Sequence, residues 1–276
     1  MTISVQTNVS ALIALQNLNK SNDEIAQAQQ RISTGLNITN AKDNASVWAI
    51  AQGQRADIGS LSAVRQSLNR AQSIADVAMT AGGTVSDLLN EIKAKVVAAQ
   101  DPSIDSTSRA AIDTDFKSLM RQISDAVANA QFDGANILDG SLPGGIQFLA
   151  NADATSFITL SSQDFSLGGT IITVPSTASL TTVTNAQTVL TEINDTIANV
   201  NAALGQIGAQ SKQIQSHNTF ISKLSDTLES GVSNLVDADM AKESARLQAL
   251  QVRQQLGVQA LSIANSAPQI ILSLFK

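Results

Sequence analysis

The chain has 276 residues and a net charge of −6, and 43% of its residues are hydrophobic but only 3% are aromatic. It contains no cysteine and a single histidine, which excludes disulfides, thiolate metal sites and a two-histidine zinc helix. The acidic balance argues against nucleic-acid binding, and aliphatic side chains with few aromatic ones favour long helices packed along their lengths. No apolar run is long enough for a membrane span, and the first residues lack the features of a cleavable signal peptide, so these signals alone predict a cytoplasmic protein.

The first predicted helix carries an apolar stripe. Its members recur at helical spacing: Val9, Leu12, Leu15, Leu18, Ile25 and Ile32. A stripe of this kind needs a partner surface, because most helical stability in proteins comes from packing of an apolar face.

Residues 31–50 read RISTGLNITNAKDNASVWAI and admit two interpretations. The segment holds the groups that a hydroxyl nucleophile and its base would use: Ser33, Thr34, Lys42 and Asp43. The favoured interpretation is a joint, in which Gly35 ends one helix and Asp43 caps the next. Trp48, the only tryptophan, then lies just past the joint.

A long heptad pattern follows. Apolar residues or glycine alternate at steps of three and four: Leu61, Val64, Leu68, Ala71, Ala75, Ala78, Gly82, Val85, Leu89, Ile92, Val96 and Ala99. This spacing predicts the seam of a coiled coil, roughly 57 Å long at the helical rise of about 1.5 Å per residue. Asp101 and Pro102 then break the helix.

A third helix is predicted from the apolar stripe between Ile112 and Ala130. Three carboxylates stand at its start: Asp105, Asp113 and Asp115. The helix dipole favours negative charge there, and a metal site is the alternative interpretation.

The segment from about 133 to 180 differs in kind. It begins with the turn-rich run FDGANILDGSLPGG and continues through IQFLA, SFITLSS and GGTIITV. Alternating β-branched residues between glycines predict short strands or hairpins.

The second half of the chain returns to helical spacing. A long stripe comprises Ala186, Leu190, Ile193, Ile197, Val200, Leu204, Ile207, Ser211, Ile214, Asn218, Ile221, Ser225, Leu228, Val232 and Leu235. Its polar members lie between 211 and 225, where buried polar groups would fix the helix register. His217 lies beside this seam and is interpreted as a flanking polar residue.

A last helix is predicted from about 239 to 267, preceded by the acidic residues Asp237 and Asp239. Its expected pairing stripe for the first helix is Ala249, Val252, Leu256, Ala260, Ile263 and Ala267. The apolar residues expected to remain unpaired are Leu247, Leu250, Val258, Leu261, Ile270, Ile271 and Leu274. An unpaired apolar surface of this size indicates an interaction site, and a head-to-tail contact there would build a filament.

The predicted fold is therefore mainly α: a long antiparallel coiled-coil bundle formed by both termini, with a small β-hairpin insert in the middle. Ordered motifs occur at both ends of the chain. The first half contains TNVSALIALQNLNKS, then RISTGLNITNAKDNASVWAIA with its S-[ST]-G-L and N-x-A-K-D elements, and then FDGANILDG. The last part contains the patterns D-x-D-x-A-x-E, Q-x-x-x-Q-x-G and A-N-x-x-P-Q. These motifs, over about 1–140 and 185–276, resemble those of bacterial flagellins, the filament subunits of the flagellum, and the short chain is similar to alphaproteobacterial members.

The resemblance implies a domain organisation. Residues 1–36 and 237–276 would form the two parts of an inner core domain, and residues 37–140 and 183–236 the two parts of a rod domain. Residues 141–182 would be a short variable β insert. Inner-core assembly would involve Val9, Leu12, Leu15, Leu18, Ile25, Ile32, Val252, Leu256, Ile263, Ile271 and Leu274, and the domain joint Gly35, Asp43 and Trp48.

The resemblance also implies a location and partners. Flagellins are secreted uncleaved through the flagellar type III export apparatus with the help of an export chaperone, which replaces the cytoplasmic expectation. The expected partners are other flagellin subunits in a homo-polymer, the filament cap and the hook-associated proteins. No catalytic residue, cofactor or metal is expected.

One family motif has diverged. Many flagellins are sensed by an innate Toll-like receptor through a rod-helix motif Q-R-x-x-x-L, and this chain places Asn90, Glu91 and Lys95 at those positions. The charge reversal and the lost apolar residue predict weak or absent receptor activation.

Three other functions compete with a filament subunit. A hook–filament junction protein has similar ends, but that family is usually longer and matches these motifs less fully. An enzyme carried on the filament is disfavoured by the single histidine and the short insert. A soluble coiled-coil adaptor would differ by failing to polymerise.

Overall fold

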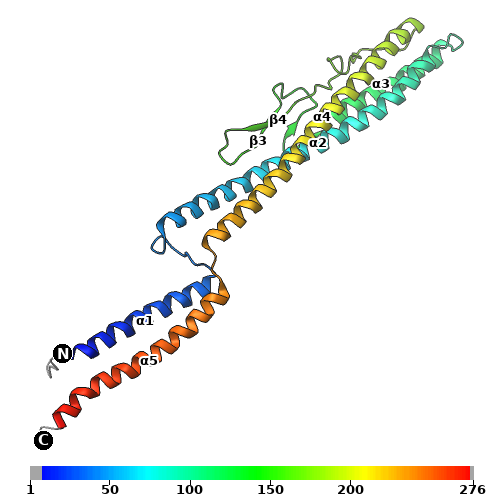
Figure 1. Ribbon diagram of the computed structural model, residues 1–276. Coiled ribbons are helices and arrows are strands. Elements are labelled where there is room, and N and C mark those ends of the chain that lie inside the picture. Colours follow the sequence, from blue (N-terminus) through cyan, green and yellow to red (C-terminus); the bar gives the residue numbers. More distant parts are fainter. Residues whose placement is uncertain (1–7, 274–276) are drawn as a thin grey trace. The chain divides into compact units, whose positions relative to one another are not determined.

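The computed structural model describes the backbone of residues 8–273 and the side chains of residues 8–266. Helices and strands follow in the order α1 (Val9–Thr34), α2 (Ala45–Ala99), α3 (Ser106–Ala128), β1 (Gln131–Phe132), β2 (Ala135–Asn136), β3 (Ile146–Leu149), β4 (Phe157–Leu160), α4 (Val183–Val236) and α5 (Met240–Ser273) (Figure 1). This confirms the mainly α fold with a small antiparallel β insert. None of the helices in the described part of the chain has the length and apolar character that a membrane crossing requires.

The chain forms two compact units. The first contains Met1–Ala56 and Thr227–Lys276, and the second contains Asp57–Asp226. Helices α2 and α4 contribute to both units, so the first unit also takes in the start of α2 and the end of α4. Within the first unit, α1 and α5 lie side by side (Figure 1).

The core of the second unit follows the predicted heptad seam of α2. Every predicted seam position from Leu61 to Ala99 is buried. Helix α4 approaches closely at Gly82, because a Cβ placed there would overlap the side chain of Leu204. Two of the three polar seam positions of α4, Ser211 and Asn218, have partners on α2. The Gln72 amide donates to the Ser211 hydroxyl at 2.8 Å, and the Asn218 amide donates to Asn69 at 2.7 Å. These polar pairs favour the interpretation that they fix the register of the two helices.

Two small hairpins follow α3, and only the second lies within the predicted insert of residues 141–182. β1 pairs antiparallel with β2, and β3 pairs antiparallel with β4 in the register Ile146↔Leu160 to Leu149↔Phe157. The predicted strand in GGTIITV is wrong, since the described residues 161–182 contain only an isolated bridge between Leu167 and Ile172. We call residues 161–182 the return segment.

The return segment belongs to the core of the second unit. Its apolar side chains Phe165, Ile172, Val174 and Leu180 are fully buried. Backbone hydrogen bonds join Gln163 N–H to Ile137 O at 2.7 Å and Phe165 N–H to Leu138 O at 2.8 Å. The segment therefore packs as part of the core instead of projecting from it.

Several polar side chains of α4, among them His217 and Thr196, form hydrogen bonds with the insert. His217 Nε2 donates to the carbonyl of Ala150 at 2.7 Å, because a carbonyl oxygen can only accept. Buried Thr196 accepts from the backbone N–H of Thr173 at 3.0 Å. His217 is thus more than the flanking polar residue that we expected.

The acidic residues of α3 have separate roles. Asp105 caps the helix and accepts from Ser108 N–H at 2.6 Å, which also holds the pKa of its carboxyl below the ordinary value. Asp113 lies within the helix, only 6% exposed, and accepts from the backbone N–H of Leu180 at 2.6 Å and from Ser179 at 3.0 Å. Among the described residues, no group of three or more metal-ligating side chains could hold a metal ion.

The second unit is expected to lose stability in acid through Asp113. Burial acts to raise the pKa of this carboxyl, but hydrogen bonds from Lys117, Leu180 and Ser179 outweigh burial and hold the pKa below its ordinary value of 3.8. A lowered folded pKa means that the stabilisation is present above the unfolded pKa and is lost as the pH falls through the folded pKa. Asp113→Asn should lower the free energy of unfolding at pH 7 by about 1–2 kcal/mol and flatten its decline below pH 4.

Urea unfolding followed by circular dichroism at pH 7 and in acid measures this change. Asp115→Asn is the matched control, since the Asp115 carboxylate lies 2.7 Å from the Lys95 ammonium at an exposed site and should contribute little. Equal effects of the two substitutions at pH 7 would contradict the anchoring role of Asp113.

Candidate functional site

The first unit is held together by a seam between α1 and α5. The inward positions of α1 alternate at steps of three and four: Ala11, Ala14, Leu18, Ser21, Ile25, Ala28 and Ile32. The inward positions of α5 follow the same rule: Glu243, Leu247, Leu250, Gln254, Gly257, Leu261 and Ala264. Ile25, Ala28 and Leu250 form a buried cluster with Leu247 packed against it. The spacing is that of a coiled coil, with small residues at many seam positions.

The predicted pairing face of α5 is wrong. Leu247, Leu250 and Leu261, which we expected to remain unpaired, face α1, whereas Val252, Leu256 and Ile263 point outward. Apolar residues occur around the whole circumference of α5, so periodicity could not single out one face. The observed face is the one on which Leu250 and Leu247 pack against Ile25 and Ala28 of α1. The side chain of Ala267 lies outside the described residues.

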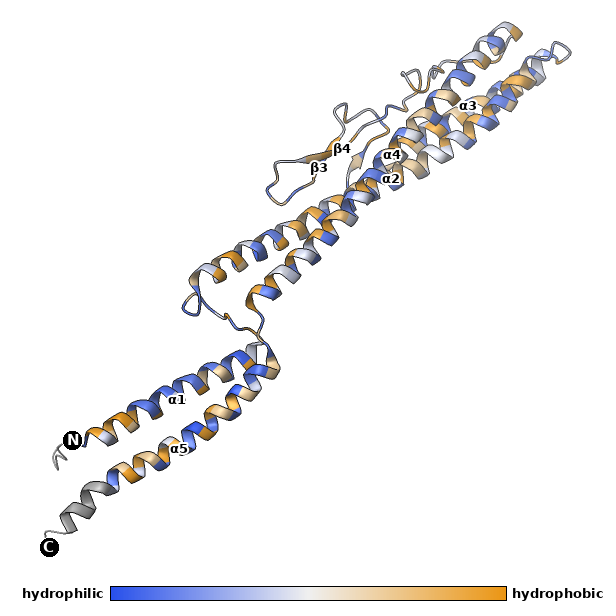
Figure 2. Ribbon diagram, in the orientation of Figure 1, coloured by the Kyte–Doolittle hydropathy of each residue, from blue (hydrophilic) through white to orange (hydrophobic). Residues whose placement is uncertain are grey.

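A set of large apolar side chains is left exposed on the two helices. It consists of Val9, Leu12, Ile13 and Leu15 on α1, and Val252, Leu256, Val258 and Ile263 on α5, which are 43–70% exposed. We call these residues the exposed apolar set. Figure 2 shows hydrophobic positions recurring along both helices. Leu18, Ile25 and Ile32 of the predicted α1 stripe belong to the seam instead. Exposed apolar side chains gathered on one helix pair are typical of an interaction surface.

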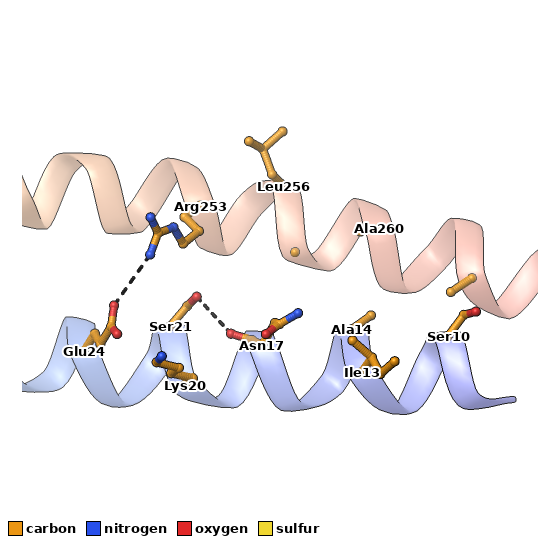
Figure 3. Close-up of a pocket in the computed structure, with 12 residues that line it drawn as sticks. Ser10, Ile13, Ala14, Asn17, Lys20, Ser21, Glu24, Arg253, Leu256 and Ala260 are labelled. Atoms are coloured by element: carbon orange, nitrogen blue, oxygen red, sulfur yellow. Dashed lines mark hydrogen bonds and ion pairs between the residues drawn. The ribbon is translucent and has the colours of Figure 1, made fainter.

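A groove of about 670 Å³ runs along this helix pair (Figure 3). Its apolar lining includes Ile13 and Ala14 of α1 and Leu256 and Ala260 of α5. Figure 3 shows Leu256 directed away from α1. At one end, Arg253 approaches Glu24 at 3.8 Å. The groove adds concave apolar surface to the exposed apolar set.

The expected joint consists of two chain segments bonded to each other. Gly35 ends α1 in a left-handed conformation, with φ of 73°. The residues after Gly35 lie next to the loop that connects α4 and α5, and there Leu36 and Asp237 form an antiparallel bridge. Asn37 N–H donates to Val236 O at 2.7 Å, and Ala238 N–H donates to Gly35 O at 2.8 Å. Segments 200 residues apart in the chain are thus clipped together by their backbones.

Asp43 does not cap α2 as predicted. The cap is Asn44, whose side chain accepts from Val47 N–H at 3.2 Å. The Asp43 carboxylate instead accepts from Thr39, from the N–H at 2.9 Å and the hydroxyl at 2.8 Å. These bonds hold the pKa of Asp43 below its ordinary value. Asp and Asn are both good caps, so the sequence could not decide between adjacent candidates.

The hydrogen bonds of this segment do not support the interpretation that it contains a catalytic nucleophile. The Thr34 hydroxyl donates to the carbonyl of Gln30 at 2.9 Å, and the Asp43 carboxylate is occupied by its own turn. Trp48 lies half-buried in the first turn of α2, where its backbone N–H donates to the backbone carbonyl of Asn44 at 3.0 Å. These groups make local hydrogen bonds, as turn and helix residues do.

A buried charge was missed at the start of α5. Asp239 caps the helix and accepts from Ala241 and Lys242 N–H at 3.0 and 3.1 Å. One turn later, Glu243 lies at the seam, only 8% exposed, with its carboxylate 3.1 Å from the Arg31 guanidinium. The sequence feature that could have revealed this buried charge is a glutamate at the first α1-facing heptad position of α5.

The remaining expected site residues lie elsewhere or outside the described part. Asn90 and Glu91 are exposed on α2, and half-buried Lys95 forms its ion pair with Asp115 of α3. Ile271 falls within α5, but its side chain lies outside the described residues, as does the whole of Leu274.

Two family models match most of the chain. Residues 5–142 match the bacterial flagellin N-terminal helical region, and residues 190–275 match the bacterial flagellin C-terminal helical region. The chain is 52% identical to flagellin FljJ of Caulobacter vibrioides over 100% of this chain and 99% of that one. It is 40% identical to a flagellin of Brucella melitensis over 99% of each chain. A Vibrio parahaemolyticus protein described as flagellar hook-associated aligns with a TM-score of 0.58 at 14% identity, over 71% of this chain and 100% of that one, which shows a likeness of fold alone.

Proposed function

The chain belongs to the bacterial flagellin family, and from this premise we propose that the exposed apolar set of α1 and α5 joins its subunits into a filament. Its relatives over the full length are alphaproteobacterial flagellins, so the chain is a subunit of the flagellar filament. The same relatives disfavour a hook–filament junction protein. Family membership also favours a structural role over an enzymatic one.

The exposure of large apolar residues on α1 and α5 carries the assembly proposal. Burying a Val, Leu or Ile side chain is worth about 1.5–3 kcal/mol, and the set offers several such side chains on each subunit. Contacts between unlike faces of successive subunits extend as a helix when the rotation between subunits does not close a ring. The groove between the two helices supplies a recess for apolar side chains of a neighbouring subunit.

The proposal extends to the organisation of the subunit. Residues 1–36 and 237–276 would form the inner core domain, with Ile271 and Leu274 adding to its assembly surface, and residues 37–140 and 183–236 the rod domain. The joint would comprise Gly35, Asp43 and Trp48, and backbone hydrogen bonds next to Gly35 hold the two chain segments of the joint together. Residues 141–182 would be the variable insert, although the burial of the return segment gives it a role in the core.

The proposed location is the extracellular filament. The subunit would leave the cell uncleaved through the flagellar type III export apparatus, after binding an export chaperone in the cytoplasm. The filament cap and the hook-associated proteins would be its neighbours at the two ends of the filament.

Polymerisation of the purified chain tests the proposed function. Concentrated protein, seeded with filament fragments or salted out with ammonium sulfate, should form long filaments that are visible by negative-stain electron microscopy. A soluble coiled-coil adaptor would remain dispersed under the same conditions, and that outcome would refute a filament subunit.

Purified monomers are expected to activate the innate Toll-like receptor weakly or not at all. Glu91 is exposed with a charge opposite to that of the arginine in the family motif, and Lys95 is engaged with Asp115. A reporter-cell assay measures the response, with the triple variant Asn90→Gln, Glu91→Arg, Lys95→Leu as the matched gain-of-response control. A strong response to the unmodified chain would contradict the expectation.

A further inference from the structure

We propose that the second unit has a built-in hinge at one level of its α2–α4 helix pair. Four glycines mark this level: Gly82 and Gly83 in α2, and Gly205 and Gly208 in α4. We call these four residues the glycine level. The inference concerns the second unit of a single chain, so it holds whether or not the exposed apolar set builds a filament.

Contacts between the two helices place these glycines at the same height. A Cβ placed on Gly82 would overlap the side chain of Leu204, and a Cβ placed on Gly208 would lie 4.0 Å from the sulfur of Met79. All four glycines lie in the interior of their helices, which extend over Ala45–Ala99 and Val183–Val236. Apart from proline, glycine is the weakest helix former at such positions.

Packing explains only part of this glycine content. Gly82 allows the close approach of Leu204, but a Cβ placed on Gly83 or Gly205 would have no neighbour within 4 Å among the described residues. Neither Gly83 nor Gly205 has the positive φ that glycine adopts without strain. Alanine would therefore fit at both positions and strengthen the helix. Glycine there makes both helices easier to deform at the same height.

Two threonines beside the glycine pair weaken α2 further. The Thr80 hydroxyl donates to Asp76 O at 2.8 Å, and the Thr84 hydroxyl donates to Thr80 O at 3.2 Å. A threonine that bonds back to the preceding turn competes with the main-chain hydrogen bonds and often bends the helix. Kinks concentrate at glycine and at places where a side chain enters the hydrogen-bond ladder, and residues 80–84 combine both features.

The chain also has room to bend at the glycine level. A shallow groove of about 430 Å³ lies between α2 and the end of α3, and most of its lining side chains are small, among them Ala81, Thr84, Ala126 and Ala130. Helix α3 ends beside this groove, at Ala128. The groove lets α2 tilt toward the end of α3.

The seam is well packed on both sides of the glycine level. Leu61, Val64 and Leu68 are buried on one side of the level. Leu89, Ile92 and Val96 are buried on the other side. Each arm of the helix pair therefore keeps its own core while the level between the arms deforms. A bend there changes the angle between the two ends of the second unit without opening either arm.

Amide hydrogen exchange of the monomer, followed by mass spectrometry, detects such a soft level as local opening. The amides of residues 83–87 and 206–209 bond to carbonyls four residues earlier, across the glycine level. They should exchange about tenfold faster than the amides of residues 89–93 and 197–201 in the same helices. This difference locates the hinge in the unmodified chain.

Gly83→Ala tests whether the two helices deform together. It should slow exchange about fivefold at residues 83–87 and, because the hinge is shared, by a similar factor at residues 206–209 of α4. Gly205→Ala should have the reciprocal effect on α2. The matched control is Gly59→Ala, which also has open space at its Cβ but lies outside the glycine level and should slow exchange only near residue 59.

Spin-label distances distinguish bending from local opening. The chain has no cysteine, so Glu91→Cys and Thr159→Cys provide the only labelling sites. Both positions are exposed, and they lie on opposite sides of the glycine level, since Thr159 belongs to the hairpin that His217 holds to α4. Electron spin resonance should show a broad distance distribution that narrows when Gly83→Ala and Gly205→Ala are combined and that Gly59→Ala leaves unchanged.

Three outcomes would overturn the proposal. Uniform exchange along α2 and α4 in the unmodified chain would show that no soft level exists. An effect of Gly83→Ala on α2 alone would show that the two helices open independently. A distance distribution that is equally narrow with and without the two alanines would show that the second unit does not bend at the glycine level.

Discussion

Filament growth should stop when Leu256 and Ile263 are both replaced by serine. The two side chains are 60% and 70% exposed on α5, so the substitutions remove apolar surface from the assembly contact without opening the seam with α1. If each contributes about 2 kcal/mol to a contact between subunits, the loss of both raises the critical concentration for assembly roughly a thousandfold. Sedimentation of polymer and negative-stain electron microscopy at increasing protein concentration measure this shift.

The matched control for this experiment is Phe157→Ser. Phe157 is also large, apolar and exposed, but it lies on β4 in the second unit. Circular dichroism should show unchanged helix content in both variants, which separates an assembly defect from misfolding. Normal filaments from the Leu256/Ile263 variant at the usual concentration would refute a contact through the exposed apolar set.

Phe165→Ala is expected to lower the free energy of unfolding of the second unit strongly. Phe165 comes from the return segment and is 1% exposed, and its ring lies within 3.6 Å of a Cβ placed on Gly82 of α2. Truncating a buried phenylalanine leaves a cavity and costs about 3–5 kcal/mol. Urea unfolding at neutral pH should show a lower midpoint with an unchanged slope.

Phe157→Ala isolates the effect of burial, because it changes the same residue type at a position that is 49% exposed. Phe157→Ala should change the free energy of unfolding by no more than about 0.5 kcal/mol. A similarly small effect of Phe165→Ala would mean that residues 161–182 are a dispensable appendage of the helices.

Several elements of the fold were predictable because they depend on local spacing and on the residues at helix ends. The heptad from Leu61 to Ala99 is buried throughout, since an apolar stripe at steps of three and four always lies on one side of a helix. Asp105 and Asp239 lie at helix starts, where the helix dipole favours negative charge, and the structure shows that both cap their helices. The end of α1 at Gly35 follows from the left-handed conformation that glycine adopts without strain.

The errors have a common physical origin. Asp43 and Asn44 are adjacent cap candidates, and the hydrogen bonds of Thr39 decide between them. The strand predicted in GGTIITV has β-branched residues, yet Ile172 and Val174 are buried outside any sheet, and Thr173 between them bonds to Thr196 of α4. In both cases the local preference was compatible with two structures, and long-range or neighbouring contacts selected one.

The sequence determined which helices form, where α1 and α2 end, and that apolar surface would remain on α1 and α5, because these properties follow from composition, spacing and capping residues. The predicted end of the last helix near residue 267 is wrong, since α5 continues to Ser273. Only the tertiary structure decided which side of α5 meets α1. Apolar residues surround that helix, so the choice depends on the packing of Leu250 against Ile25 and on the contact of Glu243 with Arg31. Both are interactions between residues more than 200 positions apart, which no local pattern contains.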